Sequence, residues 1–134
     1  MPLRLTTAAL LLPLFLSAVA AAQDPIVKID IAPNRDIFGA ASRTEPLQLE
    51  SAEAAAEHFG EEELAALNEQ VDWDNQIVLI FAWRGSGQDR LTYEILESFP
   101  EQVPFQYHPG RTRDLRPHVY VYILRSNVRW TAPR

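Results

Sequence analysis

The sequence predicts a small α+β domain: an antiparallel meander of four strands with two short helices packed on one face, preceded by a signal peptide. Three observations predict this class. The N-terminus is apolar and ends in small residues, the next part of the chain spaces its alanines and leucines as amphipathic helices do, and the C-terminal half consists of apolar segments joined by short links. Short links join antiparallel neighbours, because a parallel crossover needs about a dozen residues or more.

The first 22 residues have the features of a cleavable signal peptide. Arg4 precedes an almost wholly apolar stretch, and three consecutive alanines, the last of them Ala22, supply the small side chains that signal peptidases require. We expect cleavage after Ala22, or alternatively two residues earlier. The apolar stretch is shorter than the roughly 20 residues of a membrane-spanning helix, so residues 23–134 are expected to be a periplasmic or secreted protein without a membrane anchor.

The remaining chain, residues 23–134, has the length of one domain and contains no cysteine. It therefore has to fold by packing its core, without disulfides and without a thiolate-bound zinc ion. The whole chain has 12 basic and 18 acidic side chains, a formal net charge of −6. A negative net charge disfavours nucleic acids as partners, since phosphate polyanions are repelled. The acids concentrate before residue 83, whereas eight arginines follow it.

Two helices are predicted in the acidic part. Ser51 is a suitable N-cap for a helix that ends at Phe59, because alanines at helical spacing share one face with the phenylalanine. Gly60 separates this helix from a second one, which begins with three glutamates at the positive end of its dipole. The apolar side chains of the second helix are expected to pack on the sheet; they are Leu64, Leu67 and Val71.

Four segments predict the strands of the meander, and they comprise residues 76–83, 91–99, 103–109 and 118–125. The first and the last are apolar on both faces, which indicates strands covered on both sides. A candidate fifth strand lies at 26–31, where apolar and polar residues alternate before a turn sequence. In an up-and-down meander the first and third links lie at the same end, so the loops 84–90 and 110–117 are expected to share one rim.

The candidate binding site lies in these two loops. In the first, two glycines flank Ser86, so that successive backbone N–H groups can face an anion, although an ordinary hairpin loop has the same composition. The second contains three arginines, whose guanidinium forks match carboxylate, sulfate and phosphate geometry. The residues predicted to bind an acidic protein or a small anion are Arg84, Arg90, Arg111, Arg113 and Arg116. The alternative is a solvated loop in which Asp114 pairs with a neighbouring arginine.

A second hypothesis makes the protein an enzyme. His108, His118 and Asp114 flank or lie in the arginine-rich loop, where they can serve a small hydrolase or lyase if they converge in a pocket. The same side chains can hold a metal ion, but the neighbouring arginines would repel a divalent cation. Ser86 is a poor nucleophile candidate, because a strand rather than a helix is expected after it. We therefore assign no catalytic residue, metal or cofactor. A third hypothesis is a structural envelope protein that self-pairs through a sheet edge.

An acidic and aromatic lead-in at 72–75 precedes an apolar strand, a glycine-bearing turn at 85–87 and a second strand at 91–95, and residues 117–124 provide a closing strand. This order of elements within residues 71–125 resembles the C-terminal domain of the exported protease-complex subunit family called PrcB. The resemblance implies a non-enzymatic accessory domain and supplies no catalytic residues. The arginine-rich loop is not part of the family's pattern. The sequence thus favours a non-catalytic exported binding or protein-interaction module.

Overall fold

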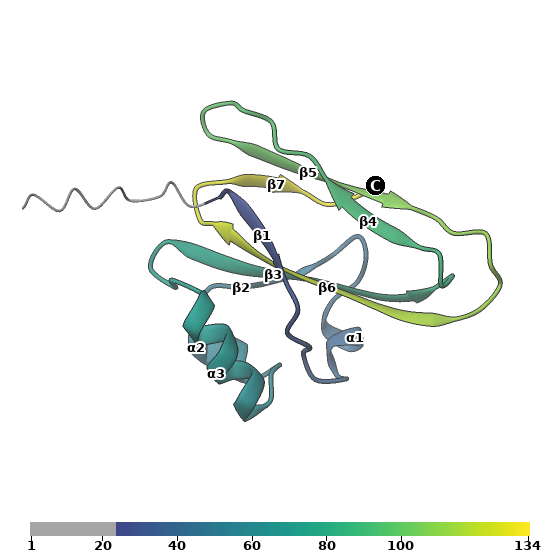
Figure 1. Cartoon of the computed structure of the whole chain (residues 1–134), viewed down its shortest axis with the longest axis horizontal. Coiled ribbons are helices and arrows are strands. Elements are labelled where there is room, and N and C mark those ends of the chain that lie inside the picture. Colours follow the sequence, from purple (N-terminus) through teal and green to yellow (C-terminus); the bar gives the residue numbers. More distant parts are fainter. Residues whose placement is uncertain (1–23) are drawn as a thin grey trace, which may run out of the picture.

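The computed structural model describes residues 24–134, and the signal peptide predicted for residues 1–22 lies outside this part (Figure 1). The described part contains seven strands and three short helices, which form a mixed fold of α and β elements. Within it, the helices are too short or too polar to cross a membrane. The strands form two mainly antiparallel sheets.

The first sheet has the spatial strand order β1, β6, β3 and β2, and the second has the order β4, β5 and β7. The strands of the first sheet are β1 (Ile26–Ile29), β6 (Arg116–Arg125), β3 (Gln76–Gly85) and β2 (Leu47–Leu49). Those of the second sheet are β4 (Arg90–Tyr93), β5 (Gln102–His108) and β7 (Arg129–Thr131). β7 runs parallel to β5, and the other neighbouring strands are antiparallel.

The centre of the first sheet is the antiparallel pair of β3 and β6, which extends from Gln76 opposite Arg125 to Gly85 opposite Arg116. Successive side chains of a strand point to opposite faces, so two strands that are apolar throughout need cover on both sides. Residues 76–82 of β3 are all buried, which confirms the prediction of a strand covered on both faces.

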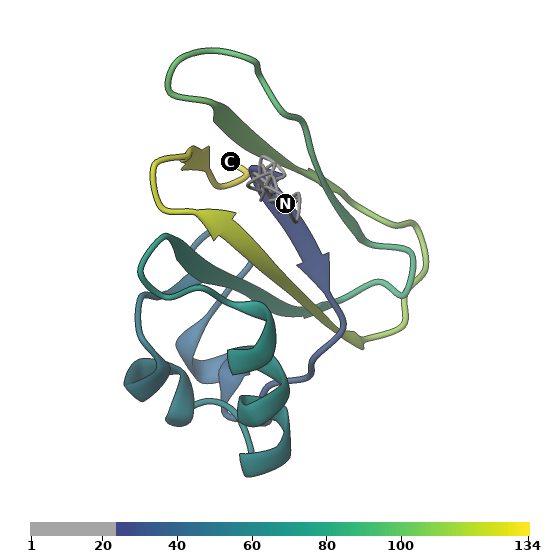
Figure 2. The ribbon, with the colours of Figure 1, turned by 60° about the vertical axis from the view of Figure 1, so that its left-hand side comes forward.

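Three helices cover one face of this sheet, in the lower part of Figures 1 and 2. They are α1 (Ile37–Ala40), α2 (Ala52–Ala56) and α3 (Glu61–Gln70). The Ser51 hydroxyl accepts a hydrogen bond from the Ala54 N–H at 3.1 Å, so the predicted N-cap of α2 is confirmed. Phe59 and Leu67 are buried in one apolar cluster with Val78 of β3. The prediction that the helices pack on one face is therefore confirmed.

The second sheet covers the opposite face of the first, so the molecule has three layers (Figures 1 and 2). The apolar side chains of this sheet join those of β3 and β6 in a second cluster. In its centre, the ring centroid of Phe81 lies 4.7 Å from that of Phe105 and 6.1 Å from that of Tyr122. The core thus has two halves, one on each side of the first sheet.

The predicted four-stranded meander is wrong. β3 pairs with β2 and β6, whereas β4 and β5 leave the first sheet and pair with each other above it. The physical reason is that the face of β3 and β6 opposite the helices needs its own cover, which the β4–β5 hairpin supplies. β4 also ends at Tyr93, short of the strand predicted over 91–99. Residues 94–99 are exposed and reach β5 through an isolated bridge from Leu96 to Gln102.

The candidate fifth strand at 26–31 is confirmed over its first four residues as β1, which pairs with β6. Sequence patterns do not predict α1, β2 and β7. Each of these elements has three or four residues, and such a segment is too short to show either helical or strand periodicity.

Candidate functional site

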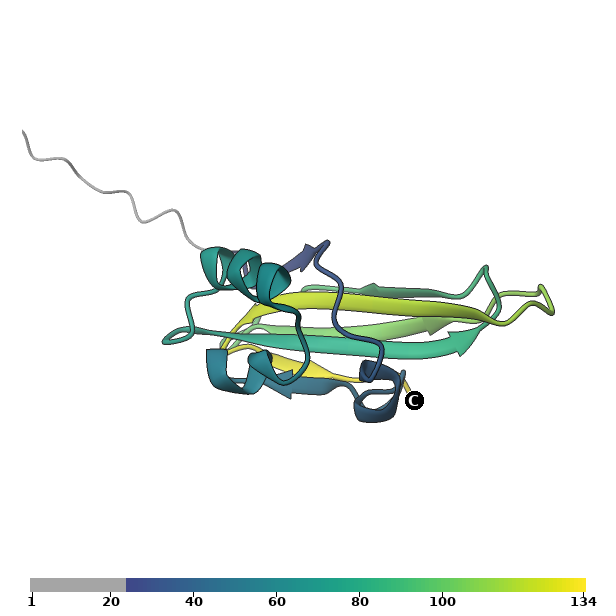
Figure 3. The same ribbon diagram turned by 90° about the horizontal axis from the view of Figure 1, so that it is seen from below.

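The two predicted loops lie side by side at one end of the molecule, on the right of Figures 1 and 3. Gly85 at the end of β3 pairs with Arg116 at the start of β6, and Arg90 at the start of β4 pairs with His108 at the end of β5. Both loops therefore leave the same end of the stacked sheets. The shared rim is present, but it results from the stacking of two strand pairs rather than from a meander.

Hydrogen bonds join the loop of residues 86–89 to that of residues 109–115, and we call this set of bonds the clasp. On its inner side, the Asp89 carboxylate accepts a hydrogen bond from the Gly110 N–H at 2.7 Å. A side chain at Gly110 would bring its Cβ to 2.7 Å from the Gln88 backbone, so only glycine lets the two loops come this close. The loops are in this way locked to each other.

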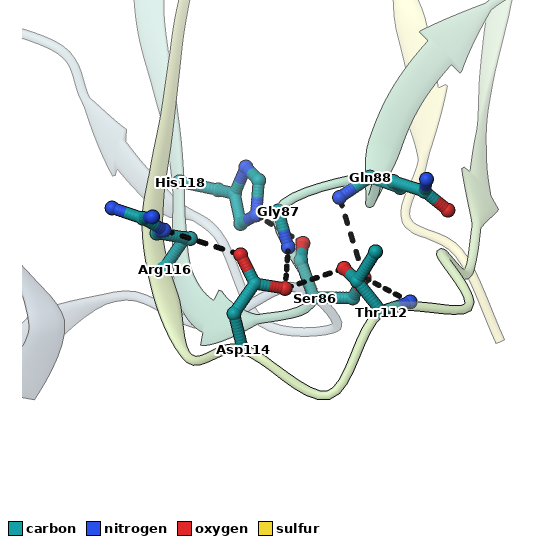
Figure 4. A network of polar contacts seen from close by, with 7 residues as sticks. All are labelled: Ser86, Gly87, Gln88, Thr112, Asp114, Arg116 and His118. Atoms are coloured by element: carbon teal, nitrogen blue, oxygen red, sulfur yellow. Dashed lines mark hydrogen bonds and ion pairs between the residues drawn. The ribbon is translucent and has the colours of Figure 1, made fainter.

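The outer side of the clasp is organised by Asp114 (Figure 4). Its carboxylate accepts hydrogen bonds from the Gly87 N–H at 3.0 Å, from the Arg116 Nε at 3.1 Å and from the Thr112 hydroxyl. The Ser86 hydroxyl accepts a further bond from the Thr112 N–H at 3.2 Å. The hydroxyl of Thr112 and then the N–H of Gly87 hold the pKa of Asp114 well below its ordinary value. Asp114 is therefore a charged acceptor that both loops share.

Asp89 anchors the clasp to β3. Its side chain is buried, and besides the Gly110 N–H it accepts a hydrogen bond from the Trp83 indole at 3.1 Å. Burial raises the pKa of Asp89, but hydrogen bonds from Gly110, Trp83 and Tyr107 lower it by more, so the pKa lies below its ordinary value. The clasp therefore rests on a buried carboxylate that stays ionised.

The enzyme hypothesis requires His108 or His118 to lie within hydrogen-bond reach of Asp114, but each of these side chains has partners of its own. The His108 Nε2 lies 2.8 Å from the Thr92 hydroxyl, and the His118 Nε2 donates to the Ser86 carbonyl at 2.7 Å. No hydrogen bond joins the three in the described part of the chain, nor are three His, Cys, Asp or Glu side chains grouped there to hold a metal ion.

The five predicted arginines surround the clasp, and all are exposed. Arg116 forms a salt bridge with Asp114, as expected for the alternative in which Asp114 pairs with a neighbouring arginine. The guanidinium carbon of Arg84 lies 4.7 Å from the centroid of the Phe38 ring, on the helix side of the sheet. The arginines of this group that have no carboxylate partner within residues 24–134 are Arg84, Arg90, Arg111 and Arg113.

A sixth arginine at this end, Arg43, lies in the segment before β2 and is not among the predicted binding residues. Its guanidinium carbon lies 3.8 Å from the centroid of the Tyr107 ring. Together with Arg84, it lines a hollow of ≈ 450 Å³ beside the clasp, whose wall includes Trp83 and Asp89. No local pattern marks Arg43, because it belongs to the acidic half and reaches this end only through the tertiary fold. We call Arg43 and the five predicted arginines the cationic rim.

Comparisons with known proteins assign no function to this arrangement. No protein-family model, no curated protein and no solved structure matches this chain. The resemblance to the PrcB family therefore stays a prediction. The chemistry available at the rim is that of guanidinium groups beside aromatic rings, which suits carboxylates, sulfate and phosphate.

Proposed function

We propose that the protein is an exported, non-catalytic binding module that holds an acidic protein or a small anion at the cationic rim. The observation that carries the proposal is that the arginine-rich loop is fixed by hydrogen bonds while two of its guanidinium groups form no salt bridge in the described part of the chain. The clasp holds residues 109–115 in place, while Arg111 and Arg113 within that loop have no carboxylate partner in the described part of the chain.

Rigidity matters because a mobile loop loses conformational entropy when it binds, whereas a loop already held in place avoids most of this cost. The Arg111 N–H donates to the Gln88 side chain at 3.2 Å, and the next residue, Thr112, donates to Ser86. The backbone that carries the arginines is therefore held while their guanidinium groups stay exposed. Such groups can form two parallel hydrogen bonds with a carboxylate or a phosphate.

The charge distribution supports an anionic partner that contacts the rim at short range. The protein as a whole carries a formal net charge of −6, so an anion is repelled by the rest of the molecule and attracted at the rim. Attraction between exposed charges is screened by salt, so binding is expected to weaken as the salt concentration rises. The predicted signal peptide and the resemblance to an exported accessory domain support the same kind of module.

A thermal-shift titration with sulfate, phosphate and a glutamate-rich peptide tests the proposal. A ligand at a hundredfold excess over its Kd stabilises the folded state by about 2.7 kcal/mol, so the melting temperature of the wild type is expected to rise with ligand concentration. The variant Arg111→Ser/Arg113→Ser is expected to lose this shift. Its stability without ligand should stay within about 0.5 kcal/mol of wild type, because both side chains are exposed.

Arg129→Ser is the matched control. Arg129 is also exposed, but it begins β7 opposite Gln102, at the other end of β5 from the clasp. Its response to the three ligands should equal that of the wild type. If sulfate, phosphate and the peptide shift the wild type and the double variant alike, the arginines are only solvated and the proposal fails.

A further inference from the structure

The outer edge of β6 is only half covered. β1 pairs with β6 from Ile26 opposite Leu124 to Ile29 opposite Val121 and then ends. β6 extends further toward the clasp, as far as Arg116, and Figure 3 shows this half of the strand passing beyond β1. There β6 has β3 on one side, and no strand of the described part of the chain on the other.

Two hydrogen bonds establish which backbone groups this edge presents. The N–H of Ser126 donates to Asn75, next to β3, at 2.9 Å, and the N–H of Arg125 donates to Pro25, next to β1, at 3.1 Å. Backbone groups of an antiparallel strand alternate between its two neighbours, so the odd-numbered residues of β6 point away from β3. Val119 therefore directs its N–H and its C=O toward the uncovered side.

These backbone groups have no partner on that side within residues 24–134. The register would place Ile31 opposite Val119, but Ile31 lies beyond the end of β1. Val119 is 37 % exposed. Pro117 directs a C=O to the same side and has no N–H, as is common in edge strands. An extended peptide can therefore form hydrogen bonds with both groups of Val119 and with the carbonyl of Pro117.

Two hollows meet at Val119 along this edge. One, of ≈ 460 Å³, is lined by Arg35, Phe38, Arg84, Pro117 and Val119. The other, of ≈ 420 Å³, is lined by Lys28, Ile29, Asp30 and Val119. Their walls combine apolar surface with three cations and a single carboxylate, and no salt bridge within residues 24–134 involves these cations. The edge is therefore complementary to an extended segment that carries negative charge.

We propose that an extended acidic peptide from another protein adds to β6 as a further strand at Val119. In this mode of recognition, backbone hydrogen bonds supply affinity and alternate side chains supply specificity. Alternate side chains of the peptide lie on opposite faces of the sheet. Its carboxylates face Lys28, which lies over the Tyr120 ring on the side of the second sheet, and its apolar side chains pack on Val119 and Phe38 on the helix side. A second copy of this chain is a poor occupant, because pairing β6 with β6 brings the same cations together.

This surface shares Arg84 with the cationic rim but uses neither Arg111 nor Arg113. A variant of these two arginines therefore distinguishes strand addition from the function proposed for the rim. The variant Arg111→Ser/Arg113→Ser is accordingly expected to bind the peptide described below as the wild type does.

The probe is an acetylated and amidated heptapeptide in which glutamate and valine alternate, and calorimetric titration measures its affinity for the protein. Val119→Pro removes the outward N–H, which has no partner in the fold, and edge strands accept proline. This variant is expected to raise the Kd by about tenfold or more. The matched variant Val119→Thr keeps both the N–H and the branched side chain, so its Kd should stay within about twofold of wild type.

Two N-methylated peptides test, on the wild-type protein, whether the peptide forms backbone hydrogen bonds with β6. They provide this test even if Val119→Pro does not fold. One is methylated at every valine nitrogen and the other at every glutamate nitrogen. Only one of these sets faces β6, so one peptide is expected to lose binding and the other to retain it. Equal binding of both forms, equal binding of a peptide with lysine in place of glutamate, or no binding of the parent peptide overturns the proposal.

Discussion

Replacing Asp89 with alanine tests how the rim is held together. The side chain is 5 % exposed and accepts hydrogen bonds from the Gly110 N–H at 2.7 Å and the Trp83 indole at 3.1 Å. A hydrogen bond to a charged group contributes about 1.5–3 kcal/mol, and alanine leaves both donors without their acceptor. Gly110 and Trp83 are half-buried, so water replaces part of this loss. We expect the free energy of unfolding to fall by about 2–4 kcal/mol.

Urea unfolding followed by circular dichroism at pH 7 measures this change, provided that the m-value is the same in both proteins. Asp74→Ala is the matched control, because Asp74 is an exposed aspartate whose carboxylate accepts no hydrogen bond in the described part of the chain. Its free energy of unfolding should stay within about 0.5 kcal/mol of wild type.

The dependence of the free energy of unfolding on pH tests whether the ionised form of Asp89 is the one that stabilises the fold. Because the fold lowers the pKa of Asp89, the stability that this carboxylate contributes is complete above about pH 3.9, the pKa of an unfolded aspartate. It is lost as the pH falls through the folded pKa. The wild type should therefore exceed Asp89→Ala in free energy of unfolding by the whole of this contribution at pH 7, and the difference should become smaller as the pH falls below about 4. A variant as stable as wild type, or a difference that widens on acidification, refutes the role given to Asp89.

Two further predictions concern the core and the N-terminus. Leu79 and Val121 are buried on opposite faces of the first sheet, so changing either to alanine should cost roughly 2–4 kcal/mol, and unchanged melting temperatures for both would contradict the three-layer core. Mass spectrometry of the protein recovered from cells should find Gln23 or Ala21 as the first residue, whereas an intact Met1 would contradict export.

Several elements could be predicted from the sequence because their signals are local. Ser51 followed by alanines is enough to begin α2, since a cap and a helical face involve only near neighbours. The apolar run in β3 likewise predicts burial on both faces, because it contains no polar face to leave exposed. The packing of the helices on one face follows from the same kind of pattern.

The candidate site was predictable in part. Gly85, Gly87 and Gly110 mark loops, and the density of arginine marks a basic surface, so the two loops could be singled out from composition alone. The bonds that join them could not, because Asp89 and Gly110 are 21 residues apart and meet only after β4 and β5 have paired.

The sequence by itself determined where the helices α2 and α3 and the strands β3, β5 and β6 form and where positive charge is dense, since these depend on the period of apolar residues and on local composition. Only the tertiary structure decided which strands are neighbours. An apolar strand pattern specifies that a face must be covered but not by which element, so the β4–β5 hairpin forms a second sheet instead of extending the first. The same step brings Arg43 to the rim and leaves the edge of β6 open at Val119, because both depend on where distant segments end in space.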